Sequence, residues 1–254
     1  ADRRGDAWNW RVQANSGSVE IDKAFTAKGD VLVVSKQQNA ELSCQSIEGD
    51  LISESDPANA SKPRTNFNNL NLKGGVRLVQ KEPLATDPAN ASLVATTTLL
   101  SESATYKIEG DPRFARLDFP TKVTVTRDEG DRVPRSPFEL IGSKGVVSIR
   151  RTPKKGESAL IADDLTGGVS IEVKRLTIVQ DKKEKKEQEK RETFRAKARR
   201  LIYTVLPNPI GNAVNQIDLL DDLDLSSSTD GEDGPEIFGA SKATLLLNEK
   251  NEIV

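Results

Sequence analysis

The stretch LIADDLTGGVSIEV, residues 160–173, contains the unit LTGGVSIEV (165–173), in which a Gly-Gly pair is followed by alternating apolar and polar side chains. Successive side chains of a β-strand point to opposite faces of a sheet, so this alternation predicts a strand with one apolar face. The pattern returns in AKGDVLVV (27–34) and LKGGVRLV (72–79), and more loosely in GSKGVVSI (142–149). We expect the glycine at the start of each unit to allow a tight turn into the strand, because glycine adopts positive φ at no steric cost.

Several of these units are followed by a second strand-like run that carries Ala or Cys. These runs are AELSCQSI (40–47), SALIADDL (158–165), FRAKARRLIY (194–203) and IFGASKATLLL (237–247). Further alternating runs are KVTVT (122–126), VVSIRR (146–151) and IDLLDDLDL (217–225), and the last places Ile217, Leu219, Leu223 and Leu225 on one face. A strand pair cannot bury its apolar face alone, so stacked pairs would form one shared core. The sequence therefore predicts an all-β protein built of repeated strand pairs.

Composition argues against catalysis, metal binding and nucleic-acid binding. The chain has 254 residues, 30% of them charged, yet a net charge of only −2, so it lacks the basic excess of a nucleic-acid-binding surface. It contains no His, which removes the commonest general base and metal ligand. Its single Cys, Cys44, lies in an alternating run and is predicted to be a small buried side chain. We expect no enzyme activity, no cofactor and no metal.

Acidic and basic clusters do not alter that expectation. The pairs Asp163–Asp164 and Asp221–Asp222 are neighbours on predicted strands, so their side chains should point to opposite faces. The acidic stretch 218–236 lacks the calcium-loop pattern and is interpreted as an exposed hairpin loop. The basic run KARR (197–200) could meet lipid phosphates, although basic residues on a solvent-facing strand are equally ordinary.

Two kinds of loop interrupt the strands. DPANAS occurs at 56–61 and again at 87–92, and Asp-Pro favours turn initiation, so we interpret both copies as strand-connecting turns. Each copy also contains Asn-Ala-Ser, a formal glycosylation acceptor at Asn59 and Asn90. The stretch 181–192 carries six basic and five acidic side chains and no apolar residue, and we expect a solvated hairpin extension or a short exposed helix.

A Gly-Asx/Gly-Val strand followed by a strand with spaced Ala resembles the OstA-like periplasmic domain of the lipopolysaccharide-transport bridge proteins. The best local match is 160–173, followed by FRAKARRLIYTV (194–205) and the C-terminal run from residue 237. The resemblance implies an elongated, open, taco-like β-jellyroll with long polar loops. It also implies a lipopolysaccharide or similar amphiphile as ligand, and partnership with other bridge components by edge-strand addition, or with further copies of the chain. We expect a single domain over 1–254, with a division near 127–138 into two repeat halves.

In such a fold the inward-facing residues would line an apolar groove for acyl chains. The expected lining residues are Val31, Val33, Leu78, Val123, Val125, Val147, Ile149, Val169, Ile171 and Val173. Alternation is the same if these side chains fill the core with one another, so a structural or adhesive β-solenoid with a closed core is the alternative.

The chain begins ADRRGDAW and contains no Met. We therefore expect that an N-terminal segment, such as an export signal or a membrane anchor, precedes it in the natural protein. The resemblance implies a periplasmic location.

Overall fold

The computed structural model describes residues 11–20, 24–35, 39–56, 59–83, 94–111, 113–130, 135, 137–150, 160–180 and 187–248. Its strands are β1 (Arg11–Gln13), β2 (Ser16–Glu20), β3 (Ala24–Ser35), β4 (Ala40–Asp56), β5 (Asn59–Pro83), β6 (Val94–Ile108), β7 (Phe114–Phe119), β8 (Val123–Asp128), β9 (Phe138–Arg150), β10 (Leu160–Gln180), β11 (Glu187–Ile210), β12 (Ala213–Thr229) and β13 (Glu232–Leu247). Among the described residues no helix has the length and apolar character needed to cross a membrane.

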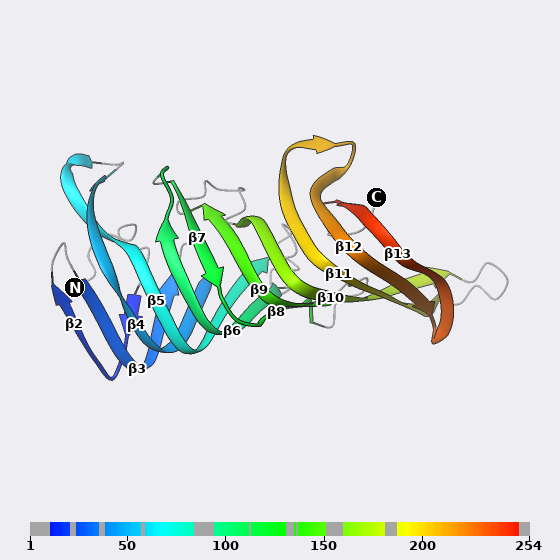
Figure 1. Cartoon of the computed structure of the whole chain (residues 1–254), viewed down its shortest axis with the longest axis horizontal. Helices are drawn as coiled ribbons and strands as arrows, with labels where there is room; N and C mark the ends of the chain where they lie inside the picture. Colours follow the sequence, from blue (N-terminus) through cyan, green and yellow to red (C-terminus); the bar gives the residue numbers. More distant parts are fainter. Residues whose placement is uncertain are drawn as a thin grey trace. The chain divides into compact units, whose positions relative to one another are not determined.

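The strands form one sheet in the order β1-β3-β4-β5-β6-β7-β9-β10-β11-β12-β13 (Figure 1). Strand β2 pairs with β3, and β8 pairs with both β6 and β9. Neighbouring strands run antiparallel and usually follow one another in the chain, as in a meander of hairpins. This arrangement confirms the predicted all-β class and is consistent with an open β-jellyroll.

The chain divides into two compact units. Unit 1 comprises Ala1–Gln80, Leu99–Thr121 and Val146–Ile161, and unit 2 comprises Lys81–Thr98, Lys122–Gly145 and Ala162–Val254. The single domain and the division near 127–138 stay predictions.

Four strands contain two consecutive residues in the left-handed conformation. These pairs are Gly29–Asp30 in β3, Gly74–Gly75 in β5, Gly167–Gly168 in β10 and Asp221–Asp222 in β12. The strand register shifts at each pair, and at three of them a single residue lies opposite: Gln45 faces the pair in β3, Arg199 the pair in β10, and Ser241 the pair in β12. Two residues opposite one define a β-bulge, which bends the strand and increases its twist.

The bulges decide which residues face the apolar side of the sheet. In the bulged strands, the buried residues that flank the pair are four positions apart: Ala27 and Val31, Leu72 and Val76, Leu165 and Val169, Leu219 and Leu223. In strands that neighbour them, the corresponding buried positions are three apart: Cys44 and Ile47, Gly142 and Gly145, Ala198 and Leu201. The extra residue on one strand is thus matched by a skipped residue on the next.

The expected role of the glycines as turns into strands is wrong. The Gly pairs lie inside long strands, because a left-handed pair also fits a bulge, where it continues the strand instead of ending it. For the same reason LIADDL (160–165), the described part of the run SALIADDL, and LTGGVSIEV (165–173), predicted as separate strands, lie in the single strand β10. In GSKGVVSI the glycines serve close packing. A Cβ on Gly145 would lie 2.4 Å from Cδ2 of Leu165 and 3.1 Å from Cγ1 of Val123.

The predicted loops are only partly described. The first DPANAS copy connects β4 to β5, with Asp56 paired to Asn59, which confirms a tight turn there. Pro57, Ala58 and the whole second copy lie outside the described residues. Residues 187–192 belong to β11 and pair with β10, so this part of the charged stretch is a hairpin extension and not a helix. Residues 181–186 also lie outside the described part of the chain.

The bulge yields a test at Gly168, whose φ is 89° and whose added Cβ would meet nothing within 4 Å. We expect Gly168→Val to lower the free energy of unfolding by about 1–2 kcal/mol, because a β-branched residue resists the left-handed conformation. Gly168→Asn should cost less, since Asn tolerates that conformation. Equilibrium unfolding in urea, followed by circular dichroism, measures both changes.

Gly110 provides the matched control, because its added Cβ also meets open space but its φ lies outside the left-handed region. Gly110→Val should leave stability nearly unchanged. Equal losses from Gly110→Val and Gly168→Val would contradict the conformational explanation.

Candidate functional site: an apolar sheet face

In unit 2, strands β10, β11 and β12 share one apolar face. The register aligns Leu165 with Leu201 and Leu201 with Leu219, and each of the three side chains is 1% exposed. This row lies on one side of the bulges. It forms because the alternation of each strand places its leucine on the same side of the sheet at this level.

A second set of apolar residues lies on the other side of the bulges. Val169 pairs with Ala198, and Ile171 pairs with Ala196, and all four are buried. The spaced alanines of β11 thus form the middle of this face, with larger aliphatic residues on β10. Because an alanine side chain is a single carbon, the side chains of β11 extend only a short distance from the sheet here.

The face becomes more accessible along the strands. Val173 pairs with Phe194, and both side chains are half-buried. In the neighbouring row, Ala196 pairs with Leu225, and Leu225 pairs with Ile237 of the edge strand β13. The Ile237 side chain is 52% exposed. Apolar side chains therefore continue from the buried interior to positions that solvent reaches.

Unit 1 repeats the arrangement on β3, β4 and β5. Val31 pairs with Cys44, and both are buried. Burial raises the pKa of the Cys44 thiol, although hydrogen bonds with the backbone of Ser46 and Lys73 act in the opposite direction. The prediction of Cys44 as a small buried side chain is confirmed. In the next row, Leu42 lies between Val33 and Leu78.

The ten expected lining residues separate into two groups by burial. Buried are Val31, Val33, Val123, Val125, Val147, Val169 and Ile171, and half-buried are Leu78, Ile149 and Val173. Their position as the lining of an open groove stays a prediction. Four buried members of the same face are absent from the predicted lining, namely Ala196, Ala198, Leu165 and Leu201. The three-residue spacing of Ala198 and Leu201 departs from strict alternation and is the signal that could have revealed them.

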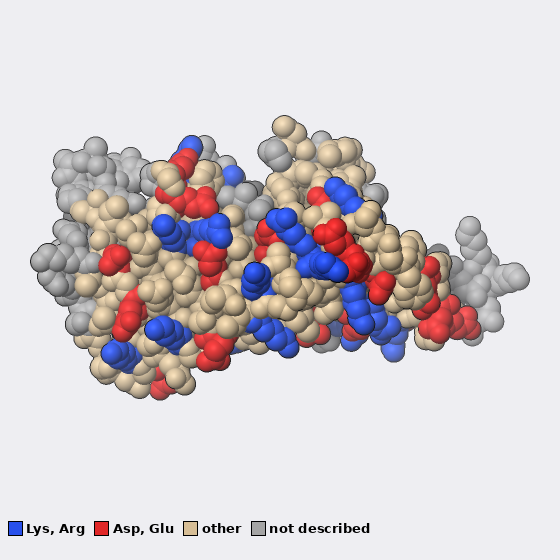
Figure 2. Space-filling model, in the orientation of Figure 1, with Lys and Arg blue, Asp and Glu red and all other residues tan. Residues whose placement is uncertain are grey.

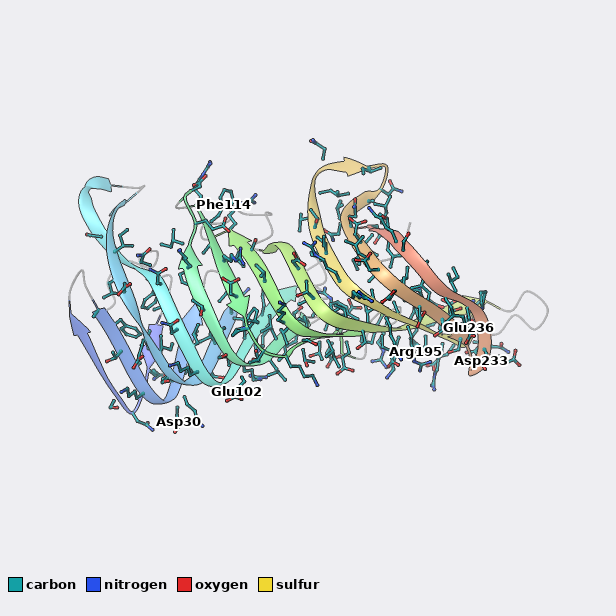
Figure 3. The ribbon with its side chains drawn as sticks, in the orientation of Figure 1. Asp30, Glu102, Phe114, Arg195, Asp233 and Glu236 are labelled. Atoms are coloured by element: carbon teal, nitrogen blue, oxygen red, sulfur yellow. The ribbon has the colours of Figure 1, made fainter. Side chains whose placement is uncertain are left out.

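The opposite face of unit 2 is charged. Arg195 of β11 donates from Nε to Glu172 of β10 at 2.8 Å, and Arg200 binds Asp164 at 2.5 Å. Figure 2 shows basic and acidic side chains intermingled over β10 to β13. In Figure 3, Arg195 and Glu236 mark this face on β11 and β13, with Ser226 of β12 paired to both. The contrast between the faces explains why each strand has a fixed register.

The expected clusters are engaged in structural contacts. Arg199 of the KARR run binds Asp222 at 2.5 Å, across the bulge, and Asp164 is held by Arg200. Burial raises the pKa of Asp218, but hydrogen bonds from Thr244, Gln216 and Lys242 leave it below its ordinary value. No group of three or more potential metal-ligating side chains occurs within the described ranges.

The comparisons with known proteins show a distant likeness to a solved structure. No family model and no curated protein matches the chain. Among solved structures, it is similar to LptH from Pseudomonas aeruginosa, described as the LptA-homologous periplasmic component of the lipopolysaccharide transport device. The identity is 16% and the TM-score 0.35, over 56% of this chain and 76% of that one.

The charged face predicts a pH dependence of stability. Hydrogen bonds from Lys174 and then Arg195 lower the pKa of Glu172 in the folded protein. A lowered folded pKa stabilises the protein above the unfolded value of about 4.3, and this stabilisation is lost as pH falls through the folded pKa.

We therefore expect Glu172→Gln to reduce stability at neutral pH by no more than about 1 kcal/mol, as for an exposed ion pair. The difference from the unaltered protein should vanish at low pH. Urea unfolding at a series of pH values measures it. A difference that grows on acidification would show that the carboxylate is not stabilised by these partners.

Proposed function

We propose that the chain is a non-enzymatic periplasmic lipid-handling protein of the OstA-like type. It shelters the acyl chains of lipopolysaccharide or a similar amphiphile against its apolar sheet face during outer-membrane assembly. The observation that carries the proposal is the continuity of this face from buried rows to the half-buried Val173 and Phe194. The motifs at 160–173 and 194–205, which resemble the OstA-like domain, support it further.

The chemistry of the face suits an acyl chain. Each methylene removed from water contributes about 0.8 kcal/mol, and no directional group is needed. Ala196 and Ala198 are buried without a ligand, so an acyl chain would contact the face at its half-buried end, beside Val173 and Phe194. An enzyme is disfavoured because the chain contains no His and because Asp164 and Asp222 are engaged by arginines.

Partners would join at the ends of the sheet. Strand β13 pairs only with β12 in the described sheet, and it exposes Ile237 and Phe238 at 52% and 69%. An unpaired edge offers backbone N–H and C=O groups to a further strand. We propose that other bridge components, or further copies of the chain, add there.

The second candidate is a structural β-solenoid with a closed core. The observation in its favour is that seven of the ten expected lining residues are buried without any ligand. The two candidates differ at the half-buried end of the face: an amphiphile in solution can reach the apolar side chains there if the face is open, but not if the core is closed.

Photo-crosslinking at Val173 and Lys174 separates the candidates. Val173 lies on the apolar face and is half-buried, whereas Lys174 is exposed on the charged face, where it binds Glu172 at 2.8 Å. With benzoylphenylalanine at one position or the other and lipopolysaccharide present, we expect a lipid adduct at position 173 and none at position 174.

Unlabelled lipopolysaccharide in excess should suppress the adduct formed with a labelled preparation. Absence of an adduct at position 173 in a folded variant would favour the closed solenoid. Equal adducts at both positions would indicate nonspecific adsorption and would also count against the lipid proposal.

A further inference from the structure

The hairpin between β11 and β12 extends past the strands that flank it. Ile210 pairs with Ala213 across the turn at Gly211 and Asn212. In the described register, the last partner of β11 on β10 is Ala162, opposite Thr204, and the last partner of β12 on β13 is Leu247, opposite Asn215. Residues 206–212, which we call the hairpin tip, therefore lie beyond the described pairing with β10 and β13. Figure 1 shows this hairpin standing above the ends of β10 and β13.

The tip and its approaches carry no charge. No Lys, Arg, Asp or Glu occurs from Leu201 to Ile217, in a chain in which 30% of residues are charged. By contrast, every other connection between consecutive strands from β3 onward contains or directly adjoins a charged residue. In Figure 2 the top of this hairpin shows neither red nor blue on the visible face. Charge is therefore absent where this hairpin extends past its neighbours.

The tip also exposes apolar surface. Ile210 is 55% exposed, and the Leu206 side chain is half-buried. Pro207 and Pro209 have no backbone N–H, so the tip has fewer donors that would lose hydrogen bonds on leaving water. Hairpin pairing between Ile210 and Ala213 satisfies part of the remaining backbone.

This composition fits a lipid surface better than a protein surface. Protein interfaces are enriched in Arg, and residues 206–212 contain neither Arg nor any other charged residue. Entry into the apolar part of a bilayer favours aliphatic side chains and is costly for Asp, Lys and Arg. The uncharged run also continues into the apolar face, through Tyr203 paired with Ile217 and Val205 paired with Asn215.

We propose that the hairpin tip, residues 206–212, inserts into the interfacial layer of a phospholipid bilayer. This contact goes beyond the proposed acyl-chain binding and does not depend on it, since a protein with a closed core could make the same contact. A few aliphatic side chains bury less apolar surface than one acyl anchor, which by itself attaches a protein only reversibly. The tip therefore makes a weak, reversible contact that is insensitive to salt, because it contains no charge.

The test uses an environment-sensitive nitrobenzoxadiazole label at the tip. The native thiol is replaced by Cys44→Ser, and the label is attached after Ile210→Cys. The control carries Glu232→Cys instead, at the exposed and acidic start of β13. Both labelled proteins are mixed with vesicles of phosphatidylcholine, either alone or with added anionic phosphatidylglycerol, after circular dichroism has established that they are folded.

We expect a blue shift and an intensity increase from position 210, quenched by nitroxide-labelled lipid and unchanged between low and high salt. Position 232 should give no shift. In the unlabelled protein, Ile210→Asp should weaken co-sedimentation with these vesicles by at least about tenfold, because an aliphatic contact is replaced by a charge.

Three results would overturn the proposal. One is the absence of a shift at position 210 in the folded protein. Another is the same shift without vesicles when the protein concentration is raised, which would identify a second copy of the chain as the occupant. The last is a shift that requires anionic lipid and disappears in salt, which would identify charged residues elsewhere as the contact. Crosslinking at Val173 is read out separately, so failure of either proposal leaves the other testable.

Discussion

The register of the sheet depends on one constraint, the β-bulge in which two left-handed residues of one strand lie opposite a single residue of the next. It adds a residue to one strand, so the neighbouring strand must skip a residue to keep its apolar side chains on the same face. Spacings of four, as from Leu165 to Val169, and of three, as from Leu201 to Ala198, therefore alternate between adjacent strands. A strand that lost its bulge would direct its next apolar residues toward the charged face, and a shift by one residue reverses every side chain beyond it. Register at one bulge is thus coupled to register at the next.

This coupling also explains how far the sequence could predict the fold. In bulged strands the spacing is even, so simple alternation placed Leu219 and Leu223 correctly on one face. In the neighbouring strands the odd spacing breaks alternation, and the face of Leu201 relative to Ala198 depends on a partner that is distant in the sequence. A Gly-Gly pair has the same local preference in a turn and in a bulge. Strand lengths and the position of the glycines within strands therefore could not be obtained from local pattern alone.

The candidate site shows the corresponding limit for function. Alternation identified aliphatic residues that are buried, such as Val169 and Ile171, because burial and alternation have the same cause. It could not separate a lined groove from a filled core, since both need the same inward-facing residues. The distinction depends instead on residues at the end of the face, where Val173 and Phe194 are half-buried. On the reverse side, ion pairs such as Arg200–Asp164 are exposed and add little stability individually. Their main physical effect is on orientation: burying these charges in the core would be costly, so this face of the sheet must face water.

The distribution of charge along the sheet separates two kinds of exposed apolar surface. On the edge strand β13, Phe238 is exposed beside the left-handed Gly239, with Glu236 and Lys242 nearby in the chain. Charges and backbone irregularity on an edge limit indiscriminate pairing while still allowing a matched partner. The tip at 206–212 has no such protection, yet it carries an isoleucine that is 55% exposed. An exposed apolar tip without charged neighbours is unfavourable in water, because it promotes nonspecific association. The same tip is favourable where the surrounding medium is apolar and a charged side chain would be costly. This is the physical reason to propose protein partners at the edge strand and lipid at the hairpin tip.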